Sequence, residues 1–195
     1  MRTAKIERKT KETDIQVEVN LDGAGKFEID TGVGFFDHML TQIAVHGLFD
    51  LVIKAKGDLY IDAHHTVEDC GLVIGAAFKQ ALGDKRGIIR TASALVPMDE
   101  TLGQVVVDFS GRPYTVISAE WTSPVVGGLP TTLLEHFFES FATASGVNLH
   151  VIVHYGQDNH HIAEALFKAM ARAMAKAVQI DPRRSGSVPS SKGML

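Results

Sequence analysis

The sequence contains little that would direct the chain out of the cytoplasm or onto nucleic acid. Its one cysteine, Cys70, excludes an internal disulfide and fits a reducing compartment, and we expect its thiol to be a small buried hydrophobic group. No apolar run approaches the ~18 residues of a membrane span, and residues 1–10 lack the apolar core of a secretion signal. The formal net charge of −4 and the pI of about 6.1 imply no general affinity for nucleic acid. We therefore expect a cytoplasmic protein without membrane or nucleic-acid partners.

Glycine-rich nucleotide loops of the Walker or Rossmann type are also missing. In other respects the composition is ordinary, with 45 % hydrophobic and 22 % charged residues, as in globular proteins. A length of 195 residues suits one domain, or two small halves that share a core. Because those nucleotide-binding loops are missing, a small phosphorylated metabolite fits this chain better than a nucleotide.

The pattern Asp-x-His-His-x-x-Glu occurs twice, once from Asp62 to Glu68 and once from Asp158 to Glu164. In a helix the glutamate lies four residues after the first histidine and three after the second, so the three side chains occupy one sector of about 100°. Two imidazoles and a carboxylate grouped in this way can ligate a divalent transition metal. One copy is a weak signal, because buried or capping histidine pairs are common. Two copies make an accidental pair of surface motifs improbable.

The repeat extends beyond this motif. Asp37-His38-Met39-Leu40 aligns with Glu135-His136-Phe137-Phe138, and each is followed by an expected strand and then by the histidine pair. Expected strands lie within 6–29, at 51–56, at 92–98, 102–109, 114–121 and 147–155, with a further short one at 59–61. Expected helices cover 35–49, 62–82, 131–145 and 159–178, with Asp62 placed to cap the second of them, and 124–130 is an expected loop.

This order predicts an α+β protein of two tandem, similar halves, residues 1–91 and 92–180, followed by a basic tail, residues 181–195. Each half would form a four-stranded sheet with two helices on one face. The helices of the two halves would then pack on each other between the two sheets.

The repeat supplies six imidazoles and two carboxylates, which are enough for two metal ions with three histidines and one glutamate each. An octahedral ion would keep two positions open for substrate or water, whereas a closed tetrahedral site would keep none. Adjacent histidines point about 100° apart on a helix, so we infer that His64 and His65 serve different ions, as do His160 and His161. Each ion would draw on both halves, which allows a subunit boundary to cross each site. The candidate ligands are His38, His64, His65, Glu68, His136, His160, His161 and Glu164.

A second group of residues could bind an anion. Taken singly, most of its cations are ordinary solvated surface charges. Lys168 differs, because it follows Glu164 by four residues and so lies on the ligand side of its helix. Ser190-Ser191-Lys192-Gly193 could wrap a phosphate with hydroxyls, amides and one ammonium group. The candidates are Arg90, Arg112, Lys168, Ser190 and Lys192.

Essentially the whole chain resembles the imidazoleglycerol-phosphate dehydratases of histidine biosynthesis. Five motifs in the family's order carry the resemblance, without departure at the positions that matter: residues 8–13 (Arg-Lys-Thr-Lys-Glu-Thr), 34–40 (Gly-Phe-Phe-Asp-His-Met-Leu), 62–69, 158–164 and 190–193.

The resemblance implies a hydro-lyase that converts D-erythro-imidazoleglycerol phosphate into imidazoleacetol phosphate on the fold called ribosomal protein S5 domain 2-like. It implies two manganese ions (Mn²⁺) per active site, held by the eight ligands, with His64 also catalytic, and a substrate phosphate held by the five anion-binding candidates. It casts Glu12 as a substrate-binding and acid–base residue, and either Glu12 or Glu164 as the group that shuttles protons. It further implies a 24-subunit homo-oligomer with active sites between subunits.

Two other interpretations of the same residues stay open at the level of sequence. One is a different binuclear metalloenzyme acting on a small phosphorylated metabolite, such as a phosphohydrolase, although aspartate bridges rather than imidazoles are usual there. The other is a non-catalytic metal-binding assembly protein.

Overall fold

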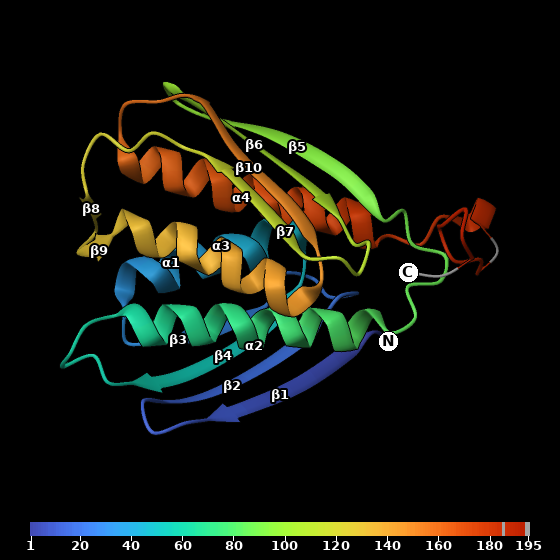
Figure 1. Ribbon diagram of the computed structural model, residues 1–195, viewed down its shortest axis with the longest axis horizontal. Helices are drawn as coiled ribbons and strands as arrows, with labels where there is room; N and C mark the ends of the chain where they lie inside the picture. Colours follow the sequence, from blue (N-terminus) through green and yellow to red (C-terminus); the bar gives the residue numbers. More distant parts are fainter. Residues whose placement is uncertain (185, 194–195) are drawn as a thin grey trace.

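The computed structural model describes residues 1–184 and 186–193 and shows two tandem halves (Figure 1). Residues 185 and 194–195 of the predicted tail lie outside the described residues. The first half consists of β1 (Thr3–Lys9), β2 (Thr13–Asn20), β3 (Phe27–Asp30), α1 (Gly34–Gly47), β4 (Asp50–Gly57) and α2 (His64–Leu82).

The second half repeats this order with one insertion. It consists of β5 (Thr91–Met98), β6 (Thr101–Asp108), β7 (Tyr114–Ser118), the short β8 (Val125–Val126) and β9 (Leu129–Pro130), α3 (Thr131–Ser145), β10 (Asn148–Tyr155) and α4 (Asn159–Val178), before a 3-10 turn, Pro182–Arg184. Gly127 and Gly128 both have positive φ, of 57° and 81°, which lets them join β8 to β9 in a two-residue hairpin inside the expected loop.

Each half builds a sheet of the same topology. The strand orders are β1-β2-β4-β3 and β5-β6-β10-β7, and only the last pair of each sheet is parallel. The expected strand at 59–61 is wrong: Leu59 to Ile61 form a turn closed by a hydrogen bond from Ile61 N–H to the Asp58 carbonyl. All three side chains are exposed, so their apolar character does not reflect burial in a strand.

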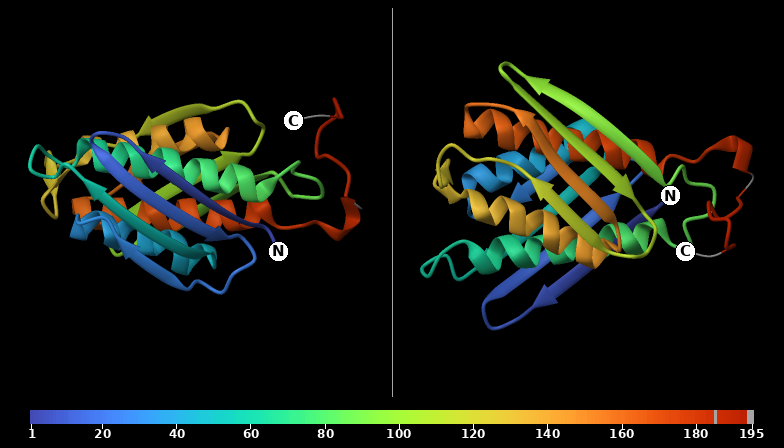
Figure 2. Two further views of the ribbon diagram at one scale, coloured as in Figure 1. Left: turned by 90° about the horizontal axis from the view of Figure 1, so that it is seen from below. Right: turned by 45° about the horizontal axis from the view of Figure 1, so that its top comes forward.

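The four helices lie between the two sheets, as Figures 1 and 2 show. Within this layer α2 packs on α3 and α1 packs on α4, so each helix pair joins the two halves. Phenylalanines fill much of the shared core, where Phe137 stacks on Phe167 with ring centroids 5.3 Å apart. Cys70 is also buried there, as expected, and burial raises the pKa of its thiol far above the usual range. The predicted α+β class and helix layer are confirmed.

Two glycines allow α2 to approach α3 closely. A Cβ at Gly75 would lie 2.6 Å from the carbonyl oxygen of Phe141, and one at Gly71 would lie 2.9 Å from Ser140 Cβ. Both distances are far inside van der Waals contact, so any larger residue would force the helices apart. This close contact brings the first turns of α2 beside α3.

The two motif-bearing helices begin in different ways. Asp158 is the N-cap of α4 in extended conformation, and its carboxylate accepts hydrogen bonds from the N–H groups of His160 and His161. In α2 the N-cap is Ala63, so the predicted cap, Asp62, lies one residue before it and accepts one bond, from His64 N–H at 2.7 Å. The expected helix start at residue 62 therefore moves to residue 64.

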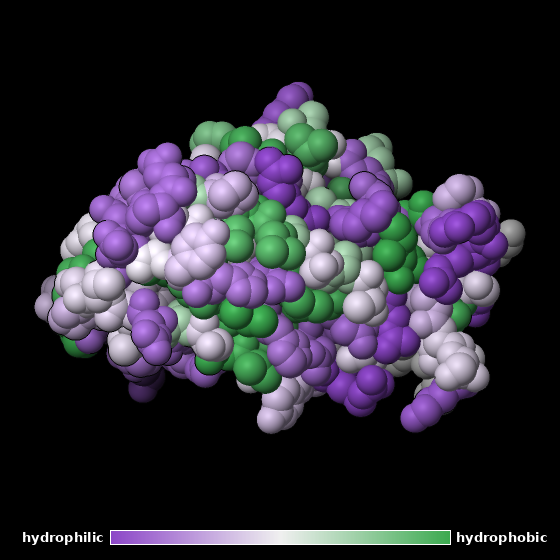
Figure 3. Space-filling view, turned by 90° about the horizontal axis from the view of Figure 1, so that it is seen from above, coloured by the Kyte–Doolittle hydropathy of each residue, from purple (hydrophilic) through white to green (hydrophobic). Residues whose placement is uncertain are grey.

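The outer faces of the two sheets differ in polarity. On the first sheet Lys5 pairs with Glu18 at 3.2 Å, and Lys54 pairs with Glu28 at 2.8 Å. On the second sheet apolar side chains gather across β5, β6, β7 and β10, and Figure 3, which views the molecule from that side, shows hydrophobic patches between polar ones. The apolar residues of this face include Leu95, Val106, Val116 and Ile152. Of the helices in the described residues, none combines the length and hydrophobicity needed to span a bilayer.

Candidate metal centres

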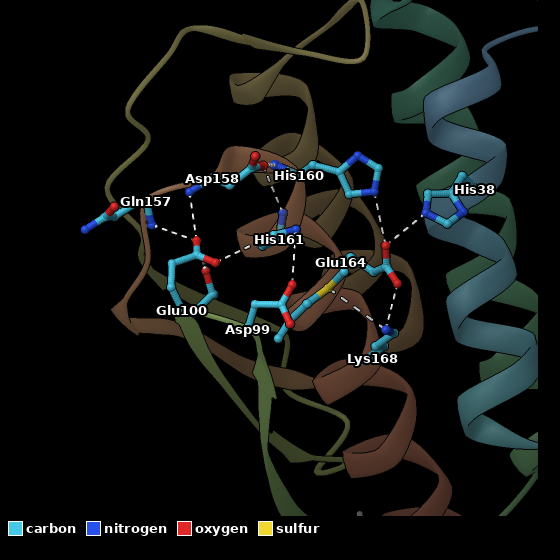
Figure 4. A network of polar contacts seen from close by, with 11 residues as sticks. His38, Asp99, Glu100, Gln157, Asp158, His160, His161, Glu164 and Lys168 are labelled. Carbon is cyan, nitrogen blue, oxygen red and sulfur yellow. Dashed lines mark hydrogen bonds and ion pairs between the residues drawn. The ribbon is translucent and has the colours of Figure 1, made fainter.

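The first cluster of potential ligands lies between α1 and α4, and we call it the α1–α4 cluster. It consists of His38, His160 and Glu164, whose ligand atoms all lie within 4.8 Å of one another. The Nε2 atoms of His38 and His160 approach Oε2 of Glu164 at 3.0 and 3.1 Å, as Figure 4 shows. Both imidazoles thus converge on one carboxylate oxygen.

Lys168 completes the charge balance of this cluster. One turn along α4, its Nζ lies 2.6 Å from Oε1 of Glu164, so the two oxygens of the carboxylate face a cation on one side and two imidazoles on the other. Burial alone would raise the pKa of Glu164, but hydrogen bonds from Lys168 and His38 outweigh it and lower that pKa to about 2. The carboxylate is therefore ionised at any physiological pH.

The second cluster, which we call the α2–α3 cluster, is the counterpart of the first in the other pair of helices. It consists of His64, Glu68 and His136, again within 4.8 Å. Here the Nε2 atoms of His64 and His136 lie 3.8 and 3.5 Å from Oε2 of Glu68, and the two rings are 4.9 Å apart. Among the described residues, the buried Nε2 of His136 has no hydrogen-bond partner.

Both clusters fit a divalent transition metal by their chemistry. Each offers two imidazole nitrogens and one carboxylate oxygen, a donor set that suits manganese, iron, cobalt or zinc. A buried ring nitrogen without a hydrogen bond costs free energy, and coordination to a cation would satisfy His136 Nε2. Each cluster also takes one histidine from one half and a histidine and glutamate from the other. The structure thus groups the candidates across the two halves, while their role as metal ligands stays a prediction.

The second histidine of each pair lies outside both clusters. Nδ1 of His65 lies 3.0 Å from Oδ2 of Asp58, and Nδ1 of His161 lies 2.8 Å from Oε2 of Glu100. These hydrogen bonds raise the pKa of both imidazoles. The spacing argument predicts that adjacent histidines serve different ions; the structure gives them different neighbours, and Asp58 and Glu100 are not among the predicted residues. An alignment of the two halves that matches the strand starts Thr13 and Thr101 also matches Glu12 with Glu100. This correspondence is the signal in the sequence that points to Glu100.

Glu12 lies at the β1–β2 turn beside the first histidine pair. Its Oε2 is 3.9 Å from Nε2 of His65, and 55 % of its side chain is exposed. The position expected from the family resemblance therefore faces the free side of an imidazole. In the second half Asp99 has the equivalent position relative to the second histidine, with its Oδ2 3.8 Å from Nε2 of His161.

The anion-binding candidates are divided between two places. Lys168 belongs to the α1–α4 cluster, whereas Arg90 lies near the other end of α4, where its N–H bonds the carbonyl of Ala177. Since α4 rises 1.5 Å per residue, the 17 residues from His160 to Ala177 separate Arg90 from that cluster by about 25 Å, and Figure 1 shows the tail at the same far end. One chain therefore does not bring the two groups together.

At that far end Arg90 is held in place. Its guanidinium forms a two-pronged ion pair with Asp108, at 2.6 and 2.9 Å, and its Nη1 donates to the carbonyl of Pro189 at 2.8 Å. Ser190 Oγ accepts the N–H of Lys192, so the tail residues form a turn beside the arginine. Arg112 follows β6 and is exposed, with its N–H bonded to Ser110 Oγ.

The surface beside the α2–α3 cluster is hollowed. A cavity of about 620 Å³ is lined by His64 and Asp62 on one side and by Gly128 and Leu133 on the other. A larger hollow, of about 710 Å³, lies against the first sheet and is lined by residues such as Glu18 and Phe27 rather than by any of the clustered imidazoles. The smaller cavity is therefore the one that relates to the chemistry.

Comparisons of the sequence with a family model and with curated proteins identify the same family. The family model described as imidazoleglycerol-phosphate dehydratase matches residues 31–174. Curated proteins of that name from Rhodopseudomonas palustris (strain HaA2) and Streptomyces griseus are 56 % and 55 % identical over 195 residues, covering all of this chain and 99 % and 98 % of theirs.

Solved structures agree with the sequence comparisons. The crystal structure of imidazoleglycerol-phosphate dehydratase from Staphylococcus aureus is 36 % identical, with a TM-score of 0.84 over 92 % of this chain and 99 % of that one. A structure of the enzyme from Pyrococcus furiosus is 35 % identical, with a TM-score of 0.85 over 97 % and 100 % of the two chains.

Proposed function

Because the chain belongs to the imidazoleglycerol-phosphate dehydratase family, we propose that it is a hydro-lyase of histidine biosynthesis. It removes water from D-erythro-imidazoleglycerol phosphate to give imidazoleacetol phosphate. We expect this activity in the cytoplasm. The observation that carries the proposal is the pair of His-His-Glu clusters, each assembled from both halves of the chain.

We propose that the two clusters hold two divalent metal ions, which are Mn²⁺ in the active enzyme. The ligands are His38, His160 and Glu164 on one side and His64, Glu68 and His136 on the other, with His65 and His161 added from neighbouring subunits. When bound, such an ion supplies Lewis acidity, which increases the acidity of the substrate's ring N–H. An imidazole-rich site suits a substrate that itself carries an imidazole.

The two candidate acid–base carboxylates differ in their freedom to move a proton. Both oxygens of Glu164 are occupied, by Lys168 and by the two imidazoles, and its lowered pKa makes it a weak base. The Glu12 side chain is half exposed, and its Oε2 lies 3.9 Å from Nε2 of His65, which is too far for a hydrogen bond. A general base must be free to take its proton from the substrate, so we assign the proton transfer at the substrate carbon to Glu12.

The separation of the anion-binding candidates supports active sites between subunits. The phosphate would be held by Lys168 together with Arg90, Arg112, Ser190 and Lys192, but Arg90 and the tail lie about 25 Å from the α1–α4 cluster of the same chain. A neighbouring subunit would have to supply one of the two groups. The apolar outer face of the second sheet offers a surface for such association, and the proposed assembly has 24 copies.

The test is a turnover assay with imidazoleglycerol phosphate on protein freed of metal by a chelator, followed by addition of Mn²⁺. We expect no turnover without the ion and formation of the acetol phosphate after its return. In the His64→Ala variant, Mn²⁺ content and turnover should fall together. Asp50→Asn is the matched control, because Asp50 contacts Ala24, Lys26 and Asn20 and belongs to neither cluster.

Two outcomes would contradict this function. Release of inorganic phosphate in place of the acetol product would indicate a phosphohydrolase. Metal-free protein that kept its assembly and its affinity for ligand, without turnover after Mn²⁺ addition, would indicate a non-catalytic assembly protein.

A further inference from the structure

His65 and His161 share an arrangement that neither metal cluster explains. In each ring Nδ1 faces a carboxylate at hydrogen-bond distance, 3.0 Å for His65 with Asp58 and 2.8 Å for His161 with Glu100. In each ring Nε2 points the other way, toward a carboxylate that is too distant for a hydrogen bond, at 3.9 Å for Glu12 and 3.8 Å for Asp99. Figure 4 shows His161 between Glu100 and Asp99.

The two Nδ1 partners are placed in different ways, Glu100 by hydrogen bonds and Asp58 by burial. Oε1 of Glu100 accepts the N–H groups of Gln157 and Asp158, at 3.1 and 2.9 Å, and the hydroxyl of Thr101 at 2.9 Å, so only Oε2 is left for His161. Asp58 is 8 % exposed, and both of its oxygens lie within 3.2 Å of His65 Nδ1. A buried or bonded carboxylate of this kind fixes the orientation of the ring that it holds.

The two carboxylates come from places that the repeat does not relate. Alignment of His64 with His160 places His154 opposite Asp58, and alignment of Thr13 with Thr101 places Glu12 opposite Glu100. Each half has thus reached the same ring geometry with a different residue, one from the turn before α2 and one from the β5–β6 turn. Descent from a common repeat unit does not account for this agreement, which points to a shared requirement of the two rings.

That requirement is a particular tautomer. A carboxylate accepts hydrogen bonds only, so the neutral imidazole beside it carries its proton on Nδ1 and presents a lone pair at Nε2. In both clusters it is likewise Nε2 that faces the glutamate, in His38, His160, His64 and His136. All six imidazoles of the repeat therefore present the same atom.

We propose that Asp58 and Glu100 are positioning residues, which keep the proton of His65 and His161 on Nδ1 and so leave each Nε2 free to bind a metal ion. This inference rests on the proposed metal-dependent function and adds two residues that hold ligands without touching the ion. The ion that receives His65 or His161 completes its shell from a cluster on a neighbouring subunit.

The test uses variants of the two carboxylates in the full-length assembly. In Glu100→Gln the amide oxygen still accepts the N–H groups of Gln157 and Asp158, just before α4, but the amide NH₂ faces His161 and requires Nδ1 to accept. In Asp58→Leu no acceptor is left for the Nδ1 proton of His65, because both of the oxygens that face it are removed. We expect the Kd for Mn²⁺, measured by titration of the chelator-treated protein, to rise by about 10- to 100-fold in each variant.

Asp50→Asn is the matched control. Asp50 also holds a loop, by accepting the N–H groups of Ala24 and Lys26, and its contacts involve no histidine. Its Kd for Mn²⁺ should equal that of the wild-type protein. If the Kd for Mn²⁺ in Asp58→Leu and in Glu100→Gln equalled that of the wild-type protein, with the assembly intact, the proposal would be overturned.

A second measurement needs neither the carboxylate variants nor activity. Solid-state ¹⁵N spectra of histidine-labelled, metal-free wild-type protein at alkaline pH report the tautomer of each ring, and His65→Gln and His161→Gln assign the signals. We expect Nδ1–H in both rings, and Nε2–H in either one would overturn the proposal for that ring. If wild-type protein bound no Mn²⁺, the proposed function would fail, while these spectra would still decide which proton the two carboxylates hold.

Discussion

The α1–α4 and α2–α3 clusters are two copies of one design, and they differ in how tightly they are closed. In the α1–α4 cluster the Glu164 side chain is 10 % exposed and meets both imidazoles at 3.0 and 3.1 Å. In the α2–α3 cluster the Glu68 side chain is 38 % exposed and stands 3.8 and 3.5 Å from its imidazoles. The same residue types at the same helical spacing thus produce one compact and one looser centre.

The clusters also differ at one position of the repeat. Lys168 lies one turn after Glu164 and binds it at 2.6 Å, whereas the counterpart after Glu68 is Leu72. The histidines and glutamates therefore follow the repeat, but the cation does not. The two sites therefore differ in charge at this position. We propose that this difference serves the anionic substrate, which Lys168 would bind.

The largest effect should follow from removing one imidazole from each cluster. His160→Ala and His64→Ala should each lower kcat/KM by about 1,000-fold, because a metal ion supplies several kcal/mol of transition-state stabilisation. Metal analysis should find about one Mn²⁺ per chain in place of two in either variant. Loss of both ions from a single substitution would show that the clusters are not separate sites.

The next effect separates the two glutamates in metal-free protein. Glu164→Gln removes the partner of a mostly buried Lys168, so we expect a loss of about 2 kcal/mol in unfolding free energy and a fall in Tm of about 4–8 °C. In Glu68→Gln no buried cation loses its partner, so the unfolding free energy should change by less than about 0.5 kcal/mol. Thermal unfolding at one fixed protein concentration measures both. Equal falls in Tm would show that Lys168 adds nothing to the first cluster.

A smaller effect concerns the cation itself. Lys168→Met should raise KM by about tenfold, since a charge-assisted hydrogen bond to phosphate contributes about 1.5 kcal/mol to binding, and kcat should change much less. Leu72→Lys, which introduces the missing cation into the α2–α3 cluster, should leave KM unchanged. A rise in KM from Leu72→Lys as large as that from Lys168→Met would contradict a phosphate-binding role specific to the α1–α4 side.

Sequence reasoning succeeded where local chemistry decides the outcome. Pro130, Gly146 and Asp158 are residue types that favour helix ends, and α3 and α4 begin and end where this pattern predicts. The angular argument also separated His65 from His64, because side-chain directions on a helix do not depend on the rest of the fold. The same argument predicts that each site draws on both halves, and the two clusters do combine histidines and glutamates of both halves, while their role as metal ligands stays a prediction.

Other features depend on how the elements pack, and the sequence does not specify them. Which glutamate meets which histidine is set by the pairing of α1 with α4 and of α2 with α3, which the glycines of α2 permit. The contacts of Asp58 and Glu100 depend on turns, where one residue more or less redirects a side chain. Leu59 to Ile61 were misjudged as a strand because apolar residues in a turn give the same short pattern as a strand.

The smallest difference between the halves lies at the first turn of the motif helices. Asp158 is the N-cap of α4 and accepts two helical N–H groups, whereas Asp62 precedes the N-cap of α2 and accepts one. Because the loss of an N-cap side chain costs about 1 kcal/mol, Asp158→Ala should lower the Tm of metal-free protein by about 2–4 °C. Asp62→Ala should lower it by about half as much, since one bond rather than two is lost. If the two variants lost equal stability, the different helix starts would have no energetic consequence, and the repeat would be symmetric at this position.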